Sequence, residues 1–514
     1  MVKIRKLYFI SFLVFILTFS MASVGICKAK NIISVQFYEI VDWDPSICYS
    51  DGARVLTNIY ETLLLYDDGK LIPVLATTFE KSPDGKVWTF KLRKGVKFHN
   101  GETFDAHAVK YSFERTTSIG RGASWIFTPI KEIKVIDDYT VQFICENPEP
   151  VDLMVSSYYG AYIMPPKLSE EKGSEWFQKG NACGTGPYKL KSFEKDVNVV
   201  LEKFDDYWGG WKPNQYDIAF YKFIAESSTA IQLLKRGEID IIEGLGVPID
   251  VHGSVDAHPD IDAVYSDSYM DLYYHFHNQK PPFDDINVRK AVCHAVNVDE
   301  IIKTIRGKTA IRAIGPIPYK MWGHDPNLKT YDYNLEKAKE YMKKSKYADQ
   351  LPIKITMTAY SEYILPVSIY IQSAIKKIGI EAEIDSTPWP AVWDGLKDKE
   401  KCPEMTVLQW WADYPTPSGW FFGNWFVEED PLFGWSYYNN PEFEKIVLEA
   451  KKLEATDREK ASELYSKAQQ ILLDDAASLF ICDYKRCIFK RKEVKGYRHI
   501  TMYQGAHWIY RLHK

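Results

Sequence analysis

Hydrophobic and polar positions alternate most regularly in the stretch that runs from residue 73 to residue 115. Every second residue from Trp88 to Leu92 is apolar and the residues between are polar, which is the period of a strand with one buried face. Asp84 and Gly85, just before it, both accept the positive φ angles of a type I′ hairpin turn. Asp105 stands where a helix N-cap is expected, ahead of helix-spaced apolar positions. This stretch therefore predicts a β-meander that runs into a helix.

The same reading predicts mixed α/β structure along the rest of the chain. We expect a strand at residues 31–38, a helix at 51–65, and two strands within 130–145 around a turn at Asp137 and Asp138. Strand 353–358, helix 365–378 and strand 380–384 form a βαβ unit, which brings its two strands parallel.

The last part of the chain predicts two helices and an aromatic tail. Asn440 caps one late helix, with Pro441 in its first turn. Residues 456–459 read Thr-Asp-Arg-Glu, a capping box that starts another helix running to about residue 473. Residues 478–514 are strand-like.

Length and composition are those of a large globular protein. The chain has 514 residues, of which 46% are apolar and 26% charged, so we expect two or three domains. Aromatic residues make up 15% of the chain, which suits either large cores or a cleft in which rings stack on a ligand. The net charge of -5, with no basic run outside the N-terminus, argues against nucleic acid as a partner.

The N-terminal segment has the pattern of an export signal. Three basic residues precede the largely apolar segment 7–19, and residues 27–29 offer a cleavage site. We expect residues 1–29 to be a signal peptide, whose removal takes four cations and changes the net charge from -5 to -9. The alternatives are lipid attachment at Cys27, where Ile26 occupies a position that favours a small residue, and an uncleaved anchor. All three place the folded body outside the cytoplasm.

Seven cysteines remain in the mature chain, so at least one is free or pairs with another molecule. Cys482 and Cys487 are close enough to clip a hairpin, and two buried thiols are the equal alternative. No C-x-x-C pair occurs, so neither a structural zinc site nor a redox motif is expected. The seven are Cys48, Cys145, Cys183, Cys293, Cys402, Cys482 and Cys487.

Three motifs carry a family resemblance. Residues 76–101 read A-T-x-x-x-x-S-P-D-G-x-x-W-T-F-x-L-R-x-G-V-x-F-H-x-G, residues 184–188 read G-T-G-P-Y, and Asn278 opens an N-x-x-x-P-F-type element followed by Val288 and Arg289. These motifs resemble those of the extracytoplasmic solute-binding proteins of peptide/nickel ABC importers, solute-binding family 5. The resemblance implies a partner, a membrane permease with its cytoplasmic ATPases, and a protein that works as a monomer.

The resemblance also implies the architecture: an α/β, two-lobed periplasmic-binding-protein fold (type II, cluster C-like) with an extra subdomain in the first lobe and a hinge between the lobes. After the signal peptide we expect lobe I at 30–57, 182–270 and 481–514, with the additional subdomain at 58–181. Lobe II is expected at 271–480. Two lobes joined by a hinge enclose a ligand, which shifts an equilibrium between open and closed forms.

The expected ligand site lies at residues 409–415, which read Q-W-W-A-D-Y-P and resemble the W-x-A-D-Y segment of oligopeptide-binding members. The resemblance makes Asp413 the partner of a peptide α-ammonium and Trp410 a pocket-lining residue. A carboxylate among aromatic rings is costly to bury without a partner, so it reaches water or holds a cation. The alternative is an Asp that caps the following Pro-rich turn. Further candidate ligand-binding residues are Trp411, Tyr414, Trp389 and Trp420, and Trp393 and Trp425 are weaker candidates for stacking.

The expected ligand is an oligopeptide rather than a dipeptide. Dipeptide-specific relatives hold the ligand carboxylate with an Arg near the helix after the 353–358 strand, and residues 351–400 contain no Arg. Lys376 and Lys377 lie late in that helix and are expected to be exposed. Oligosaccharides, which relatives bind by Trp stacking, and nickel or haem complexes are the alternatives.

No cofactor, metal or catalysis is expected. His275 and His277 fall on the same face of a strand, but no third metal ligand can be placed, so we expect core or hydrogen-bonded histidines. A secreted hydrolase is the rival from another class. It lacks support, because the chain has no G-x-S-x-G or H-E-x-x-H motif.

Overall fold

The computed structural model describes residues 31–37, 40, 42–411, 413–427 and 433–514. Within α11 (Trp389–Leu396), the side chains of Trp389, Pro390 and Asp394 lie outside this description. The expected export signal and Cys27 also lie outside the described residues. Of the helices that are described, none combines the length and apolar composition needed to span a bilayer.

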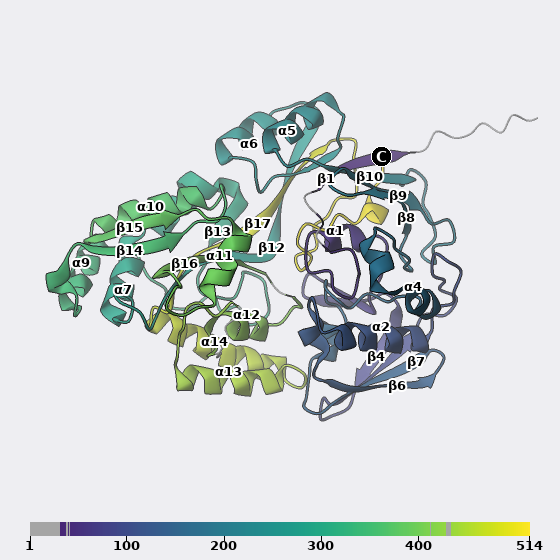
Figure 1. The fold of residues 1–514 in the computed structure, drawn as a ribbon, viewed down its shortest axis with the longest axis horizontal. Helices are drawn as coiled ribbons and strands as arrows, with labels where there is room; N and C mark the ends of the chain where they lie inside the picture. Colours follow the sequence, from purple (N-terminus) through teal and green to yellow (C-terminus); the bar gives the residue numbers. More distant parts are fainter. Residues whose placement is uncertain (1–30, 38–39, 41, 412, 428–432) are drawn as a thin grey trace, which may run out of the picture.

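Two lobes share one continuous sheet (Figure 1). Its strand order is β15-β14-β16-β12-β17-β11-β1-β10-β9-β8, with β13 beside β17. The long antiparallel strands β12 (Ile261–Phe276) and β17 (Ser478–Arg491) stand at the middle of this order and connect the two halves. The two-lobed α/β fold expected from the sequence is therefore present, and β12 and β17 form the connection between the lobes.

Lobe I contains the β8 side of the sheet. Strand β1 pairs in parallel with β10 and β11, and β8, β9 and β10 form an antiparallel meander. Its elements are β1 (Ile32–Phe37), α1 (Gly52–Leu56), β8 (Tyr188–Glu194), β9 (Asn198–Lys203), β10 (Ile218–Phe223), α5 (Ser227–Arg236), β11 (Ile241–Glu243) and α6 (Ile249–Asp256).

The helix expected at 51–65 was wrong in length, because α1 ends at Leu56. Asn58, just beyond it, is buried and bonds to distant segments. Its side-chain amide donates to the His507 carbonyl oxygen at 3.0 Å, and its Oδ1 accepts from the Ile509 amide at 2.9 Å. These tertiary hydrogen bonds hold the chain out of a helical path that local propensity allows.

A separate four-stranded sheet, with strand order β4-β5-β7-β6, forms the additional part of lobe I. Residues Trp88, Phe90 and Leu92 on β5 are buried, which confirms the predicted alternation. Helix α2 begins after Asp105, whose side chain accepts from the Ala108 amide at 3.0 Å, as predicted. The elements here are β2 (Leu64–Asp67), β3 (Lys70–Pro73), β4 (Ala76–Lys81), β5 (Val87–Leu92), α2 (Ala106–Ile119), a 3₁₀ turn (Ser124–Phe127), β6 (Ile130–Asp137), β7 (Thr140–Cys145), α3 (Val151–Met154) and α4 (Pro166–Gln178).

The β4–β5 hairpin is present, but its turn is not type I′. Gly85 has a φ of 71°, whereas Asp84 is not among the described residues with positive φ. The Asp84 carboxylate instead accepts hydrogen bonds from the Ser82 hydroxyl at 2.6 Å and from the Lys86 amide at 3.1 Å. These bonds favour a longer turn in which only the glycine takes the left-handed conformation.

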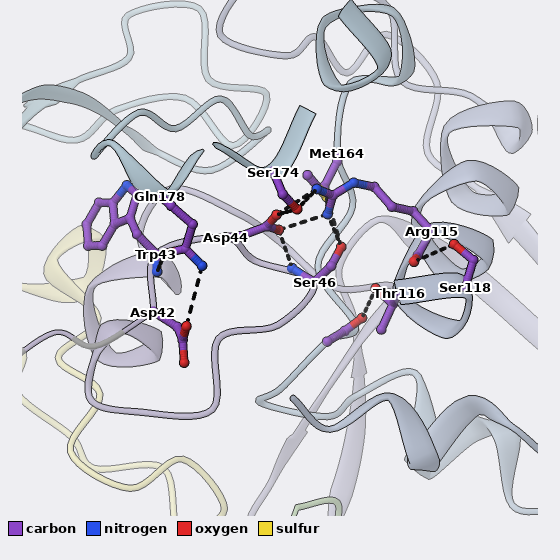
Figure 2. Close-up of polar contacts among 11 residues, drawn as sticks. Asp42, Trp43, Asp44, Ser46, Arg115, Thr116, Ser118, Met164, Ser174 and Gln178 are labelled. Carbon is purple, nitrogen blue, oxygen red and sulfur yellow. Dashed lines mark hydrogen bonds and ion pairs between the residues drawn. The ribbon is translucent and has the colours of Figure 1, made fainter. Parts of the chain in front are cut away.

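A buried ion pair ties the loop after β1 to the additional sheet's helices (Figure 2). The Arg115 guanidinium on α2 donates to both carboxylate oxygens of Asp44, at 2.8 and 2.6 Å. The hydroxyl of Ser174 on α4 also donates to Asp44, at 2.5 Å, and Arg115 donates to the Ser46 hydroxyl at 2.6 Å. Three segments distant in sequence therefore meet at one fully satisfied carboxylate.

Lobe II contains the β15 side of the sheet. The predicted βαβ unit is confirmed, because β14 and β15 are parallel and α10 connects them. Apolar side chains cover both faces of the sheet: Leu272 and Tyr274 on β12 pack into one core, and Tyr273 into the other. The elements are α7 (Ile286–Ala295), α8 (Val298–Ile301), a π turn (Ile302–Arg306), a 3₁₀ turn (Gly307–Thr309), β13 (Ala310–Arg312), α9 (Leu335–Lys344), a 3₁₀ turn (Ala348–Gln350), β14 (Ile353–Thr358), α10 (Leu365–Lys376), β15 (Ile380–Asp385), α11, β16 (Met405–Trp410), α12 (Ser418–Trp425), α13 (Pro441–Leu453) and α14 (Arg458–Asp474).

Two helix N-caps in the last part of the chain lie at the predicted residue or next to it. Asn440 caps α13 as predicted, accepting from the Glu442 and Phe443 amides. The cap of α14 is Asp457 rather than Thr456, because the Asp457 carboxylate reaches the Lys460 amide at 3.1 Å. After β17 the chain returns to lobe I, where it ends in a 3₁₀ turn (Ile509–Arg511).

The seven cysteines that the structure describes are all buried and free. Cys482 and Cys487 lie on the same strand, β17, so they do not clip a hairpin. Burial raises the pKa of each of these two thiols to about 12. Of the two readings that the sequence left open, the structure shows two buried thiols.

Candidate functional site

The segment at 409–415 lies where β16 leaves the sheet and meets lobe I. Three contacts join it to lobe I. The Tyr49 hydroxyl donates to Asp413 Oδ1 at 2.7 Å, the Ser157 hydroxyl donates to the Asp413 carbonyl oxygen at 2.8 Å, and the Trp411 indole nitrogen donates to the Tyr159 hydroxyl at 3.2 Å. The expected site segment therefore lies at the junction of the two lobes.

The Asp413 carboxylate faces a cavity and has no cationic partner among the described residues. Burial raises its pKa to about 7, and hydrogen bonds from Tyr49 and Trp125 act in the opposite direction. Its donors are thus a phenol and an indole, both neutral. A carboxylate in this setting gains most from a cation that enters the cavity.

The cavity beside Asp413 has a volume of about 350 Å³. Its charged lining residues are Asp413, Glu149 and Lys451, which together carry an excess of negative charge when ionised. Lys451 acts on Glu149, whose pKa is raised mainly by burial, and its ammonium lies 5.2 Å from the centroid of the Phe422 ring. The cavity wall is otherwise largely aromatic, with Trp125, Trp410, Tyr414, Phe422 and Phe433.

A second cavity, of about 230 Å³, lies beside the first. Trp410 and Phe433 line both cavities, and their rings meet edge to face at 4.9 Å. The other residues of the second lining are Tyr49, Tyr360, Trp393, Leu408, Gln409 and Trp411. Trp393 packs against Phe433 at 5.1 Å. The two cavities therefore flank a shared aromatic wall at the junction of the lobes.

The residues predicted for the site fall into three groups. Asp413, Trp410 and Tyr414 line the larger cavity, and Trp410 and Trp411 line the smaller one. Trp420 is fully buried in the core and donates to Asp271 Oδ2 at 2.8 Å, so it lines neither cavity. Trp389 is the first residue of α11, and its side chain lies outside the described residues.

The sequence reasoning overlooked an arginine that is linked to the smaller cavity through Tyr363 and Gln409. Arg306 is 5% exposed, and its Nη1 donates to the Tyr363 carbonyl oxygen at 3.0 Å. Its Nε and Nη2 have no hydrogen-bond partner among the described residues, and its guanidinium lies 5.2 Å from the centroid of the Tyr484 ring. The Tyr363 side chain bonds in turn to Gln409, which lines the cavity.

Other donors near Arg306 also lack acceptors. The amide nitrogen of Gln409 and the hydroxyls of Tyr484 and Ser361 are buried and form no hydrogen bond with the described residues. A buried cation surrounded by unpaired donors is the complement of an anion. Residues 351–400 contain no arginine. Arg306 belongs to the π turn at Ile302–Arg306, and its bond to the Tyr363 carbonyl oxygen brings it to the start of α10.

His275, on β12, and His277, just after the end of this strand, are both held by hydrogen bonds within the protein. His275 Nδ1 bonds to the Ser478 hydroxyl at 2.9 Å, and His277 Nε2 bonds to the Lys399 carbonyl oxygen at 3.1 Å. Burial lowers the pKa of His275 to about 3, so this side chain is neutral. In the part of the chain that the structure describes, no three His, Cys, Asp or Glu side chains gather as metal ligands would. The expectation of hydrogen-bonded histidines is confirmed.

A second set of contacts joins the lobes at their outer edge, and we call it the outer contact (Lys81, Asp152, Ala455 and Arg458). Arg458 Nη2 donates to both oxygens of Asp152, at 2.7 and 2.8 Å, and the Lys81 ammonium donates to the Ala455 carbonyl oxygen. The lobes approach closely here, since a Cβ atom on Gly85 would lie 3.1 Å from the Ala455 side chain.

Sequence reasoning identified Asp413 and its aromatic neighbours but not their partners from elsewhere in the chain. Tyr49, Trp125 and Arg306 come from a loop, a 3₁₀ turn and a π turn. Isolated residues in irregular segments show no periodicity, so their role depends on tertiary contacts.

Similar proteins are known. The family model "Bacterial extracellular solute-binding proteins, family 5 Middle" matches residues 70–430. The probable D,D-dipeptide-binding periplasmic protein of Escherichia coli (strain K12) is 30% identical over 432 residues, covering 82% of this chain and 81% of that protein. The periplasmic oligopeptide-binding protein of the same strain is 26% identical, covering 93% and 91% of the two chains.

Solved structures of other proteins superpose on this fold over most of the chain. The ABC transporter-associated periplasmic binding protein from Helicobacter pylori, in complex with the peptide STSA, superposes with a TM-score of 0.79 at 27% identity, covering 94% of this chain and 98% of that one. A substrate-binding protein from Listeria monocytogenes reaches a TM-score of 0.83 at 18% identity, covering 94% and 99%, which shows the shared fold. These relatives are binding proteins of ABC transporters and not enzymes, and the chain belongs with them to the bacterial extracellular solute-binding proteins, family 5.

Proposed function

We propose that this protein captures peptides outside the cytoplasm, oligopeptides in preference to dipeptides, and delivers them to an ABC permease. The observation that carries the proposal is the Asp413 carboxylate, which lies between the lobes without a cationic partner among the described residues. A peptide α-ammonium is a cation of suitable size and hydrogen-bonding capacity. Closure of the lobes around it removes water and strengthens the pairing.

The shape of the site supports a ligand longer than two residues. The two cavities lie on either side of Trp410 and Phe433, so together they offer a ligand anchored at Asp413 more room than the first cavity alone. The linings are mostly aromatic and carry few polar groups, which suits side chains of varied sequence. Relatives named as dipeptide-binding, glutathione-binding and oligopeptide-binding proteins support the peptide class as a whole.

Arg306 supports a ligand that also carries a carboxylate. Arg306 is linked to the smaller cavity through Tyr363, whose side chain bonds to the lining residue Gln409, whereas Asp413 lines the larger cavity. A zwitterionic peptide would neutralise both buried charges in one binding event. In this proposal Asp413 holds the amino end, Trp410, Trp411 and Tyr414 contact the side chains, and Arg306 attracts the acidic group through the wall formed by Tyr363 and Gln409.

The partners and place of action follow from the family. We propose that the protein acts as a monomer in the cell envelope and presents its closed form to permease subunits that are driven by cytoplasmic ATPases. The ligand favours the closed form, because it contacts both lobes only when they meet. In this proposal the permease recognises that closed form.

The test is native mass spectrometry of the protein purified from its own host, followed by denaturation and identification of the released compounds. A heterogeneous set of peptides of three or more residues is the expected result. A uniform dipeptide would overturn the length preference alone. A sugar or a metal complex would overturn the peptide proposal while leaving the family assignment intact.

A further inference from the structure

The strands that connect the lobes are not regular along their length. Strand β12 pairs with β17 from Ile261 to Asp267, then the register shifts, and pairing resumes at Asp271. On the first side of this irregularity β17 also pairs with β11 of lobe I, and on the second side β12 pairs with β16 of lobe II. The irregularity therefore marks the place where the sheet passes from one lobe to the other.

Two carboxyl groups lie directly opposite each other at this place. Asp271 on β12 and Asp483 on β17 are register partners, the first pair on the lobe II side of the irregularity. Directly opposed residues of an antiparallel pair project to the same face of the sheet, with Cβ atoms about 4.5–5.5 Å apart. Both side chains are buried, with 2% and 3% exposure.

Each carboxyl is half satisfied by a neutral donor. The Trp420 indole donates to Asp271 Oδ2 at 2.8 Å, and the Tyr319 amide donates to Asp483 Oδ2 at 2.9 Å. The Oδ1 atoms of both residues have no hydrogen-bond donor among the described residues. One proton held between two such oxygens supplies the missing hydrogen bond and removes one of two like charges.

We propose that Asp271 and Asp483 share one proton at the hinge while the lobes are closed, and that loss of this proton favours lobe opening. The pair would then set the balance of open and closed forms according to the pH outside the cytoplasm. The inference rests on lobe closure and not on the chemistry of the ligand, so it stands or falls separately from peptide binding.

Neighbouring groups do not supply a countercharge. Tyr273 on β12 and Cys482 on β17 sense the pair electrostatically, and burial raises the pKa of each, so both are neutral near pH 7. From α12 and β16 the pair meets the Trp420 indole and the Trp410 amide. From the loop after β13 it meets the Tyr319 amide.

The cations that flank the pair along the chain are engaged elsewhere. Lys320 pairs with Asp267 at 2.8 Å, and Lys485 lies 3.8 Å from the same carboxylate. Neither Asp271 nor Asp483 forms an ion pair with a Lys, Arg or His in the described part of the chain. A proton is therefore the remaining means of reducing the charge of the pair.

The direction of the effect follows from burial. Burial, with the charge of Asp483 as a further cause, raises the pKa of Asp271 well above its ordinary value, and burial raises that of Asp483 to about 7. A carboxyl whose pKa is higher in the closed form stabilises that form at low pH. The contribution disappears as the pH rises through the closed-form pKa, so the closed fraction falls with rising pH.

The pair is also connected to the candidate site. Asp271 is the register partner of Trp410, which lines both cavities, and it accepts a hydrogen bond from Trp420, which belongs to the same hydrophobic core as Trp410. A change in the charge of the pair acts on strands that carry the cavity wall.

The experiment is single-molecule fluorescence energy transfer on the ligand-free, full mature chain. Dyes are attached to cysteines introduced at exposed positions at opposite ends of the molecule, Lys191→Cys on β8 and Lys344→Cys on α9, since the native thiols are buried. The ratio of closed to open molecules is measured from pH 5.5 to 9. We expect it to fall as the pH rises, by about tenfold for each unit by which closure raises the pKa of the pair.

Variants make the test specific. All proteins in the comparison carry Asp413→Asn, because Asp413 also titrates near pH 7 at the junction of the lobes. In this background Asp483→Asn keeps the shape and removes one of the two like charges, so its ratio is expected to change less with pH than that of the unaltered pair. Asp262→Asn removes a partly exposed carboxylate from the same sheet and is expected to keep the wild-type dependence. A ratio that does not change with pH in the protein with the unaltered pair would overturn the proposal, as would an equal pH dependence in Asp483→Asn.

Two further measurements keep the test decisive if Asp483→Asn does not fold. Circular dichroism identifies a variant that does not fold, and Asp271→Asn then replaces it. Infrared difference spectra with labelled Asp, taken at pH 6 and pH 9, should show a protonated carboxyl band that disappears at the higher pH in the wild type and is reduced in either variant. Identical spectra in wild type and variant would also overturn the proposal.

Discussion

The Tyr49 hydroxyl donates to Asp413 Oδ1 at 2.7 Å, so a residue of lobe I bonds directly to the proposed ligand anchor of lobe II. Edge-to-face contacts with Trp125 and Tyr159, at 5.3 and 4.6 Å, hold the Tyr49 ring in place. Closing the lobes therefore completes the surroundings of Asp413 and determines how readily its carboxylate ionises.

Replacing Asp413 by Asn should weaken the binding of peptides with a free amino end by about tenfold to 100-fold, the usual range for one charge-assisted hydrogen bond. Isothermal titration calorimetry with trialanine and N-acetyl-trialanine measures this. The loss is expected for trialanine alone, because the acetylated peptide has no ammonium. An equal loss for both peptides would assign Asp413 a structural role. Asp349→Asn, in an exposed turn of lobe II, is the matched control.

In the Asp483→Asn variant, Asp271 and Asp483 can no longer share a proton at the hinge. In this variant, peptide affinity should rise with pH through the region near 7. Burial raises the pKa of Asp413 to about 7, so below this value the anchor is protonated and cannot pair with an ammonium. Tyr49→Phe removes a hydrogen bond that lowers this pKa, and it should shift the midpoint of the affinity profile to higher pH. Titrations between pH 5.5 and 8.5 test the shift, and an unchanged midpoint in Tyr49→Phe contradicts it.

Replacing Arg306 by Met should separate ligand affinity from stability. We expect affinity for trialanine to fall at least tenfold, with a smaller effect on the C-terminally amidated peptide. The melting temperature of the ligand-free protein should stay the same or rise, because a buried charge without an acidic partner is replaced by an apolar side chain. Differential scanning calorimetry measures the second quantity. A lower melting temperature together with unchanged affinity would make Arg306 a purely structural residue.

The buried Asp44–Arg115 pair should contribute far more to stability than an exposed pair on the same helix. Arg115→Met leaves Asp44 buried without its cation and is expected to lower the free energy of unfolding by about 3–5 kcal/mol. The matched control is Lys110→Met, which breaks an exposed ion pair with Glu114 and should cost less than about 1 kcal/mol. Urea denaturation followed by fluorescence compares the two, and similar losses would contradict the prediction.

His275 should make the protein sensitive to acid. Burial lowers its pKa to about 3 in the folded state, whereas an unfolded histidine titrates near 6.5. The unfolded state therefore takes up the proton first, and this group's contribution to stability is lost as the pH falls below about 6.5. His275→Gln should reduce the loss of stability between pH 7.5 and pH 5 by about 2 kcal/mol. Urea midpoints of both proteins at both pH values measure this, and parallel losses would count against it.

The sequence predicted regular elements well where one period dominates a segment. The β5 alternation, the βαβ unit around α10 and the caps at Asp105 and Asn440 are local patterns, and all are present. Errors arose where distant contacts decide. Helix α1 ends early because Asn58 bonds to the C-terminal segment, and the turn at Asp84 depends on bonds to Ser82 and Lys86.

The candidate site could be foreseen only in part, for the same reason. Asp413 and Trp410 stand in one recognisable segment, so the sequence indicated them together. Arg306 stands far earlier in the chain, where no local pattern links it to that segment. Only the pairing of β13 with β17 and the bond to the turn before α10 bring it there. Trp420 shows the opposite error, because a core tryptophan and a ligand-stacking tryptophan look alike in a sequence.

The outer contact bears on how long the lobes stay closed. Lys81, Ala455 and Arg458 belong to or adjoin β4, α13 and α14, which lie below β12 and β17 in Figure 1. None of its residues lines either cavity at the site. If the lobes open by rotation about β12 and β17, the bidentate bond between Arg458 and Asp152 breaks, whichever molecule is bound. A substitution at this contact would then change how long the lobes stay closed and leave the lining of both cavities as it is.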